Sequence, residues 1–91
     1  MRIDKFLKLS RLVKRRATAQ EMIEVGAVRL NGNAVKPSAS VQAGDKIEIA
    51  FPRRLLAVRV LTTGELEIKR GAAPVTDAEE RRLAEDEMPW Q

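Results

Sequence analysis

The sequence contains no cysteine and no histidine, and each absence excludes a class of site. Without cysteine, the chain can form neither a disulfide framework nor a thiolate metal site. Without histidine, it lacks the commonest general base and the commonest metal ligand at neutral pH. We therefore predict that the protein is not an enzyme and has no catalytic residue, metal site or cofactor, although a carboxylate-based enzyme stays chemically possible.

Aromatic residues are also scarce, since Phe6, Phe51 and Trp90 are the only ones in 91 residues. The core must therefore be mostly aliphatic, and the stacked aromatics typical of single-strand binders are missing. No apolar run approaches the ~20 residues that a membrane-spanning helix needs. The charged N-terminal stretch also lacks the uninterrupted apolar core of a signal peptide. These features predict a cytoplasmic protein with no membrane partner, which we expect to be monomeric.

What the sequence does have is an uneven distribution of charge. The first sixteen residues carry seven Lys or Arg against one acid, Asp4, whereas residues 71–91 carry two Arg against six acids. A basic head and an acidic tail in one short chain indicate a polyanionic partner for the head. The alternative is a basic helix face that is simply solvated.

The first quarter of the chain predicts two short helices joined by basic residues. From Ile3 to Val13 the apolar residues follow the spacing of one helix face, and the pattern breaks near Arg11. In the second helix, Thr18 and Glu21 fit a capping box at its start. Gly26 marks its end, because glycine readily adopts the left-handed conformation there.

The pattern then changes to the alternation that is typical of strands. Asn31-Gly32 predicts a tight hairpin turn with positive φ at both positions. Further strands are expected over residues 46–51, 55–61 and 65–69. After a flexible junction at 71–74, a weakly docked acidic helix is expected from Thr76 to about Glu87.

The sequence thus predicts an α+β fold in which two N-terminal helices pack on a small, mostly antiparallel sheet. Residues 1–70 are expected to form one domain that carries the basic head. Residues 71–91 are expected to form an acidic C-terminal tail that is partly helical or flexible.

The charges of the basic head are arranged as an RNA-binding surface requires. Each Lys or Arg that neutralises a phosphate releases counterions, so closely spaced cations bind folded RNA. Helix periodicity places Lys8, Arg11 and Arg15 on one side of the first helix. Arg15 and Arg16 also precede the second helix, where free backbone N–H groups and the helix dipole favour an anion. We therefore predict that the head binds the phosphate backbone of structured RNA.

Two alternatives remain open at this point. A helix-turn-helix DNA-binding regulator would use the same helices, but the DNA backbone would repel Glu21 and Glu24 on its recognition helix. Recognition of RNA by shape and phosphate position suits such a surface better. A protein–protein adaptor would instead act through the acidic tail and Trp90.

Several spaced motifs resemble the S-four-type RNA-binding domain, also called the alpha-L RNA-binding motif. The motifs are Arg2-Ile3-Asp4-Lys5-Phe6-Leu7, residues 10–16 with Lys14-Arg15-Arg16, Ala19 with Ile23, residues 26–32, and Val41 with Gly44-Asp45-Lys46-Ile47. The resemblance covers roughly residues 1–49 and implies the α+β fold described above. The chain is most similar to small bacterial members that act in ribosome-associated quality control and are related to a ribosome-associated heat-shock protein.

This resemblance implies a role on the large ribosomal subunit. Its expected partners are 23S rRNA and tRNA, at subunits where a stalled peptidyl-tRNA is trapped, with a factor that tails the nascent chain as a further partner. A general role in rRNA assembly or heat shock is the alternative. In the family, the basic residues that match Arg2 and Arg16 are implied to matter most.

The full set of predicted RNA-binding residues combines the basic head with the hairpin region. It consists of Arg2, Lys5, Lys8, Arg11, Lys14, Arg15, Arg16, Arg29, Asn31 and Lys36. One position departs from the family pattern, because Ala17 stands where Thr or Ser usually follows the basic pair. We expect the capping hydroxyl to move to Thr18, so that the second helix starts one residue later.

Overall fold

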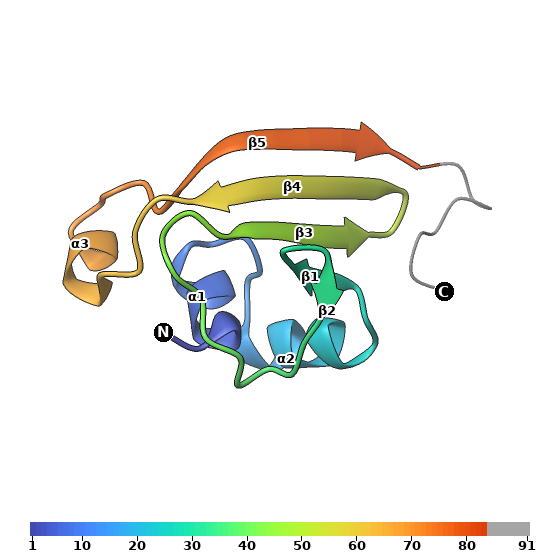
Figure 1. Ribbon diagram of the computed structural model, residues 1–91, viewed down its shortest axis with the longest axis horizontal. Coiled ribbons are helices and arrows are strands. Elements are labelled where there is room, and N and C mark those ends of the chain that lie inside the picture. Colours follow the sequence, from blue (N-terminus) through green and yellow to red (C-terminus); the bar gives the residue numbers. More distant parts are fainter. Residues whose placement is uncertain (84–91) are drawn as a thin grey trace.

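The computed structural model describes residues 1–83, which form helices and one sheet (Figure 1). The elements in chain order are α1 (Ile3–Leu9), α2 (Arg16–Glu24), β1 (Val28–Leu30), β2 (Asn33–Ala34), β3 (Lys46–Phe51), β4 (Arg54–Val60), α3 (Glu65–Lys69) and β5 (Val75–Arg82). The sheet has five strands in the order β2-β1-β3-β4-β5, and every neighbouring pair is antiparallel. The predicted α+β fold is confirmed.

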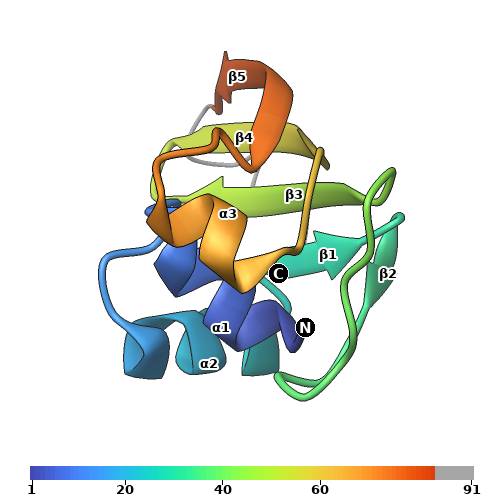
Figure 2. The same cartoon turned by 90° about the vertical axis from the view of Figure 1, so that its left-hand side faces the viewer.

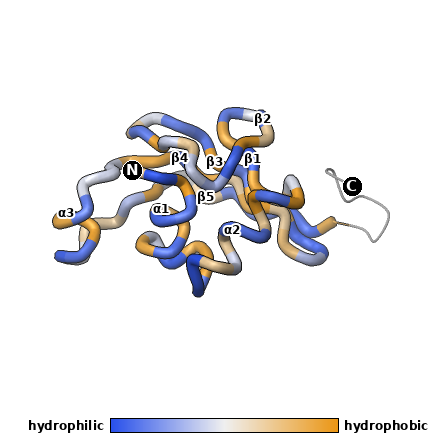
Figure 3. Tube along the Cα trace, turned by 90° about the horizontal axis from the view of Figure 1, so that it is seen from below, coloured by the Kyte–Doolittle hydropathy of each residue, from blue (hydrophilic) through white to orange (hydrophobic). Residues whose placement is uncertain are grey.

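The two N-terminal helices cover only one part of the sheet. Both views place α1 and α2 on the side of β1 and β3, α3 beside α1, and β5 at the edge away from α1 and α2 (Figures 1 and 2). Apolar stretches recur between polar ones along α1 and α2 (Figure 3), as expected for helices with one buried face. The largest fully buried apolar side chains are Phe6, Ile3, Leu7, Ile23, Ile47, Ile49, Val28, Val41, Val58 and Val60. The predicted aliphatic core is confirmed.

The first helix is shorter than its apolar pattern, because the chain turns sharply at Arg11. Helix α1 ends at Leu9, and Arg11 adopts a left-handed conformation with φ 62°. The turn is closed by the N–H of Val13, which donates to the carbonyl of Leu7 at 3.1 Å. It brings Val13 back into the core, where this residue is 5% exposed. The break expected near Arg11 is confirmed.

The start of the second helix differs from the prediction. Helix α2 begins at Arg16, and Arg15 precedes it in extended conformation without a side-chain capping bond. Thr18 therefore lies inside the first turn, and the capping box predicted from Thr18 and Glu21 is wrong. The end of α2 was predicted correctly, since Gly26 follows it with φ 80°.

The hairpin predicted at Asn31-Gly32 is present. The two turn residues have φ 51° and 83° and connect β1 to β2, with Leu30 paired to Asn33. The Asn31 side chain also fastens the turn to β3, because its Oδ1 accepts the backbone N–H of Lys46 at 2.9 Å.

The strand predicted over residues 65–69 is wrong, because this segment is helix α3. Leu66 and Ile68 would share one face of a strand, whereas a helix separates them. Accordingly, Ile68 is 8% exposed and Leu66 is 67% exposed. The hydroxyl of Thr62 organises the start of the helix by accepting the N–H of Gly64 and donating to Glu67.

The acidic helix predicted from Thr76 is also wrong over the part that the structure describes. Residues 75–82 form β5, which pairs along β4 with an irregularity between Ala57 and Arg59. An edge strand offers a full row of backbone partners, whereas this segment has too few apolar residues to dock a helix. The remainder of the predicted helix, up to Glu87, lies outside the described residues. The domain boundary at residue 70 stays a prediction, and the sheet continues across it through β5.

Candidate nucleic-acid interface

A buried carboxylate organises the start of the basic head. Asp4 is fully buried, and its two oxygens accept hydrogen bonds from four neighbours. Gln20 Nε2 donates at 2.9 Å and the backbone N–H of Lys5 at 2.7 Å. Arg2 Nη2 lies 3.1 Å from Oδ2, and Arg16 Nε lies 3.3 Å from the same oxygen. We call Asp4, Arg2, Arg16 and Gln20 the Asp4 cluster.

The charge of Asp4 is maintained by these neighbours. Burial raises its pKa, but the hydrogen bonds from Gln20, Arg16 and the N–H of Lys5 lower it by more, so the pKa lies below the ordinary value of 3.8. The carboxylate is therefore ionised at neutral pH. Asp4 in turn orients two bases, Arg2 and Arg16. Lys8, four positions further along the same helix, forms no ion pair with Asp4 within residues 1–83.

The Asp4 cluster fixes two arginines without hiding them. The side chains of Arg2 and Arg16 remain 49% and 44% exposed. A guanidinium has five N–H donors in a fixed fork, so one edge can bind Asp4 while the other faces solvent. The cluster also joins α1 to α2, since Arg2 precedes the first helix and Arg16 begins the second.

Lys5 is held differently from the other basic residues of the head. Its Nζ lies 2.8 Å from Glu65 Oε2 on α3, and Lys69 Nζ lies 2.9 Å from the other oxygen. The hydrogen bonds from Lys5 and Lys69 lower the pKa of Glu65 to about 2. Lys5 is therefore neutralised by a residue that is 60 positions away in the chain.

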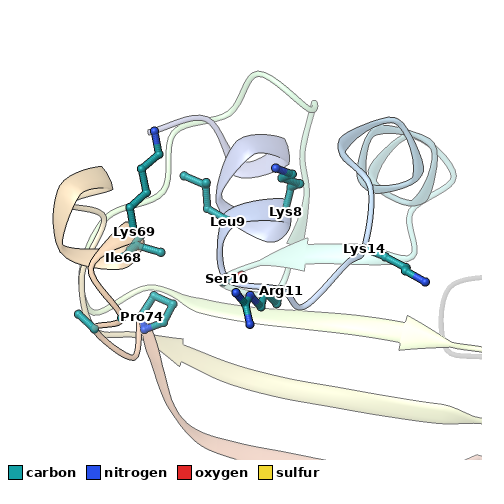
Figure 4. Close-up of a pocket in the computed structure, with 10 residues that line it drawn as sticks. Lys8, Leu9, Ser10, Arg11, Lys14, Ile68, Lys69 and Pro74 are labelled. Atoms are coloured by element: carbon teal, nitrogen blue, oxygen red, sulfur yellow. The ribbon is translucent and has the colours of Figure 1, made fainter.

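Three further cations surround the end of α1 and the loop that follows it. Lys8, Arg11 and Lys14 are exposed, and within residues 1–83 their side chains form no ion pair. We call them the loop cluster. They line a hollow of about 610 Å³ that Lys69 and Pro74 border on the other side. Figure 4 shows Lys8 on α1, Arg11 on the loop and Lys14 pointing away from α3.

The remaining predicted residues lie beside these two clusters or on the hairpin. Arg15 is exposed directly before α2. Lys36 is exposed in a segment that runs along the start of α1, where the N–H of Asp4 donates to the carbonyl of Pro37. Arg29 and Asn31 belong to the β1–β2 hairpin, and their side chains already make hydrogen bonds within the protein. The Arg29 guanidinium donates to the carbonyl of Gly32 at 3.4 Å, and the Asn31 amide bonds Asp45 at 3.2 Å.

Gln20 is the member of the site that the sequence analysis missed. Its amide donates a 2.9 Å hydrogen bond to Asp4. The signal was present in the spacing, because Gln20 follows Arg16 by four positions and so lies on the same face of α2. What the sequence alone does not show is that this face meets Asp4.

The described residues contain neither a group of His, Cys, Asp or Glu that could hold a metal ion nor a helix that could cross a membrane. The site is instead an exposed cationic surface built on one buried acid. Such a surface can hold phosphates by charge-assisted hydrogen bonds.

Comparison with known proteins identifies the family. Residues 1–47 match the S4 domain. The RQC P-site tRNA stabilizing factor of Bacillus subtilis is 41% identical over 86 residues, which cover 93% of this chain and all of that protein. The factor of the same name from Streptococcus pneumoniae is 41% identical over 73 residues, or 80% of this chain and 83% of that one.

A solved structure supports the same assignment. The trimeric structure of Vibrio cholerae heat shock protein 15 matches with a TM-score of 0.67 and 28% identity, over 89% of this chain and 81% of that chain. The fold likeness therefore extends past the S4 domain into the second half of the chain. Together these matches show that the chain belongs to the S4 domain family of RNA-binding proteins, among the relatives of the RQC P-site tRNA stabilizing factor and heat shock protein 15.

Proposed function

We propose that this protein binds structured RNA on the large ribosomal subunit, where it stabilises the P-site tRNA during quality control of stalled nascent chains. The expected contacts are 23S rRNA and the tRNA moiety of the peptidyl-tRNA. The observation that carries the proposal is the Asp4 cluster, which presents two exposed arginines in fixed positions. The name of the relative that is 41% identical over 93% of the chain supports the assignment to this pathway.

The function needs positioning rather than catalysis. Ordering a free arginine on binding costs side-chain entropy of about 0.5–1.5 kcal/mol. Arg2 and Arg16 are already held by Asp4, so much of this cost is met in the folded protein. Their planar forks can bind phosphate oxygens in a bidentate way, which fixes both distance and orientation. Two arginines that are oriented by one carboxylate can therefore hold bound RNA in a single orientation.

The loop cluster, together with Arg15 and Lys36, adds general attraction to the same polyanion. If about four head charges meet phosphates, the logarithm of affinity falls against the logarithm of salt concentration with a slope of roughly −3 to −4. These residues increase affinity for any nearby phosphates. The orientation of the bound RNA then comes from the Asp4 cluster.

We further propose that the chain acts as a monomer and cooperates with a factor that tails the nascent chain. The Vibrio cholerae relative was solved as a trimer, so the oligomeric state is open to direct test. Light scattering at cellular concentrations should give the mass of one 10.2 kDa chain. A trimer would contradict this part of the proposal and leave the RNA-binding part standing.

A helix-turn-helix function has less support than RNA binding. Glu21 and Glu24 are exposed on α2, the helix that would enter a DNA groove. Their carboxylates would face the phosphates of a duplex groove. A general role in rRNA assembly or heat shock is the stronger competitor, because heat shock protein 15 is among the matching relatives.

The test is to isolate tagged protein from cells and fractionate it on a sucrose gradient. The protein should sediment with large subunits, and those subunits should carry peptidyl-tRNA. The variant with Arg2→Ala and Arg16→Ala should lose at least tenfold in occupancy. Association with immature subunits that lack peptidyl-tRNA would favour the assembly role, and an unchanged profile of the double variant would contradict the proposal.

A further inference from the structure

A second hollow lies on the other side of the loop cluster. It has a volume of about 760 Å³ and is formed between the loop after α1, helix α2 and the turn from β3 to β4. Its floor is apolar and includes Leu12, Met22, Phe51 and Pro52. All three cations of the loop cluster also line it, so these cations stand between this hollow and the one shown in Figure 4.

The lining has an unusual combination of properties. No acidic residue borders the hollow, and its three cations have no ion pair among the described residues. An apolar floor with a cationic rim is complementary to a ligand that has a flat apolar part and anionic neighbours on both sides. A nucleotide within an RNA strand has this composition, because each base lies between two phosphates. The volume falls in the range of small-ligand sites, roughly 300–1,000 Å³.

The backbone at the rim gives a second observation. Arg11 has φ 62°, a conformation that glycine adopts without strain and that other residues rarely adopt. A residue retained in such a conformation points to a function when its side chain is placed at a site. Arg11 lines both hollows. The backbone reverses direction at this residue and so places the next residue, Leu12, in the floor of the second hollow.

The hollow also depends on residues beyond the part that matches the S4 domain. That match ends at residue 47, whereas Ala50, Phe51 and Pro52 contribute to the apolar lining. The Phe51 ring is held in place by the Arg54 guanidinium, whose central carbon lies 4.4 Å from the ring centroid. The β3–β4 hairpin therefore converts one side of the helix pair into a bounded hollow.

We propose that this hollow receives one unpaired nucleobase of the bound RNA, while the loop cluster binds the phosphates on either side of it. The inference rests on the proposed function as an RNA binder and adds a specific element that it recognises. Thr18 lines the hollow as well, and its hydroxyl can donate or accept a hydrogen bond at the edge of the base.

The test uses three matched RNAs in fluorescence anisotropy titrations. The first is a short perfect duplex, the second carries a single-nucleotide bulge, and the third carries the same bulge with an abasic residue. The abasic bulge keeps the distorted backbone and removes only the base. The base-containing bulge should bind roughly tenfold more tightly than the abasic one, the range expected for one buried base.

The protein variants separate the apolar floor from the charges. Leu12→Ser and Met22→Ala should each abolish most of the preference for the base-containing bulge. They should leave the salt dependence of duplex binding unchanged, because apolar contacts release no counterions. The matched control is Leu66→Ser, since Leu66 is 67% exposed and lies outside the hollow. Thermal unfolding of each variant verifies that it folds.

Three results would overturn the inference. One is equal affinity of the native protein for the base-containing and abasic bulges while duplex binding persists. Another is equal behaviour of Leu12→Ser and Leu66→Ser. The third is that an acidic amphipathic peptide displaces the base-containing and the abasic bulge equally well. That result would assign the hollow to a protein partner. Failure to bind any of the three RNAs would contradict the proposed function itself.

Discussion

The two basic clusters of the head differ in how their charges are held. Arg2 and Arg16 share a buried carboxylate, whereas the cations of the loop cluster have no ion-pair partner within residues 1–83. The first arrangement gives up one unit of positive charge to gain fixed geometry. The second keeps all of its charge and leaves the side chains free. The comparison indicates that position matters in the Asp4 cluster and that charge matters in the loop cluster.

The largest expected effect is that of Asp4→Asn, which separates position from charge. The substitution raises the net charge by one, so a charge count predicts tighter RNA binding. We expect weaker binding, because an amide offers one acceptor in place of the two oxygens that orient Arg2 and Arg16. The free energy of unfolding should fall by about 2 kcal/mol, since part-buried donors such as the N–H of Lys5 and the amide of Gln20 compete for the one acceptor that is left. Chemical denaturation and RNA titration measure the two effects.

The matched control for this prediction is Glu24→Gln. Glu24 is exposed on α2 and lies outside the Asp4 cluster. Its replacement by Gln makes the same change in net charge as Asp4→Asn. The RNA affinity of this variant should rise slightly and its stability should stay nearly constant.

Because the folded-state pKa of Asp4 is lowered, the contribution of this carboxylate to stability is present above the unfolded-state pKa and is lost as the pH falls through the folded-state value. Asp4→Asn should therefore weaken the acid dependence of unfolding at pH values below 3.8.

The next effect is that of Arg16→Lys, which keeps the charge and removes the planar fork. Arg16 bonds Asp4 through both Nε and Nη2, and a lysine cannot make this contact and also present a second donor edge. RNA affinity should fall roughly tenfold, as expected when a bidentate arginine is replaced. The reverse exchange in the loop cluster, Lys14→Arg, should change affinity less than about twofold. Equal losses at the two sites would remove the distinction between the clusters.

A smaller effect is expected for Arg11→Gly, which should separate stability from binding. Glycine adopts the left-handed conformation at this position without strain, so the free energy of unfolding should rise by about 1 kcal/mol. RNA affinity should fall, and the salt slope should become shallower by roughly 0.9 if Arg11 meets one phosphate. Thermal unfolding and titrations at several salt concentrations test both parts. Arg11→Ala serves as the control, because it loses the charge and keeps the strain.

The local features of the fold could be predicted because neighbouring residues determine them. The spacing of Ile3, Phe6 and Leu7 defines the buried face of α1, and Asn31-Gly32 defines the hairpin through its positive φ angles. The capping box at Thr18 is the exception among these local features, and the other errors occurred where partners distant in the sequence decide the outcome. Residues 75–82 form a strand because β4 offers an unpaired edge, and α3 forms where alternating Leu66 and Ile68 resembled a strand.

The basic residues of the candidate site could be predicted from the sequence, whereas the contacts among them depend on residues that are distant in the sequence. A count of charged residues located the basic head and its single acid, Asp4. The count could not show which bases Asp4 holds, because Arg16 is 12 positions away and reaches it only through the packing of α2 on α1. Nor could it show that Lys5 is occupied by Glu65.

That ion pair gives the smallest expected effect and a last test of what free charge contributes. Glu65→Gln should release Lys5 and raise RNA affinity about twofold, because one more cation becomes able to meet a phosphate. Stability should change little, since exposed ion pairs contribute little.

The pKa of Glu65 is lowered from 4.5 to about 2 by hydrogen bonds from Lys5 and Lys69. Its small contribution is therefore complete above pH 4.5 and lost as the pH falls through about 2. An NMR titration of the Glu65 carboxyl carbon should show this midpoint, and Lys5→Ala should move it upward. A midpoint unaffected by Lys5→Ala would mean that Lys5 is already free and belongs with the loop cluster.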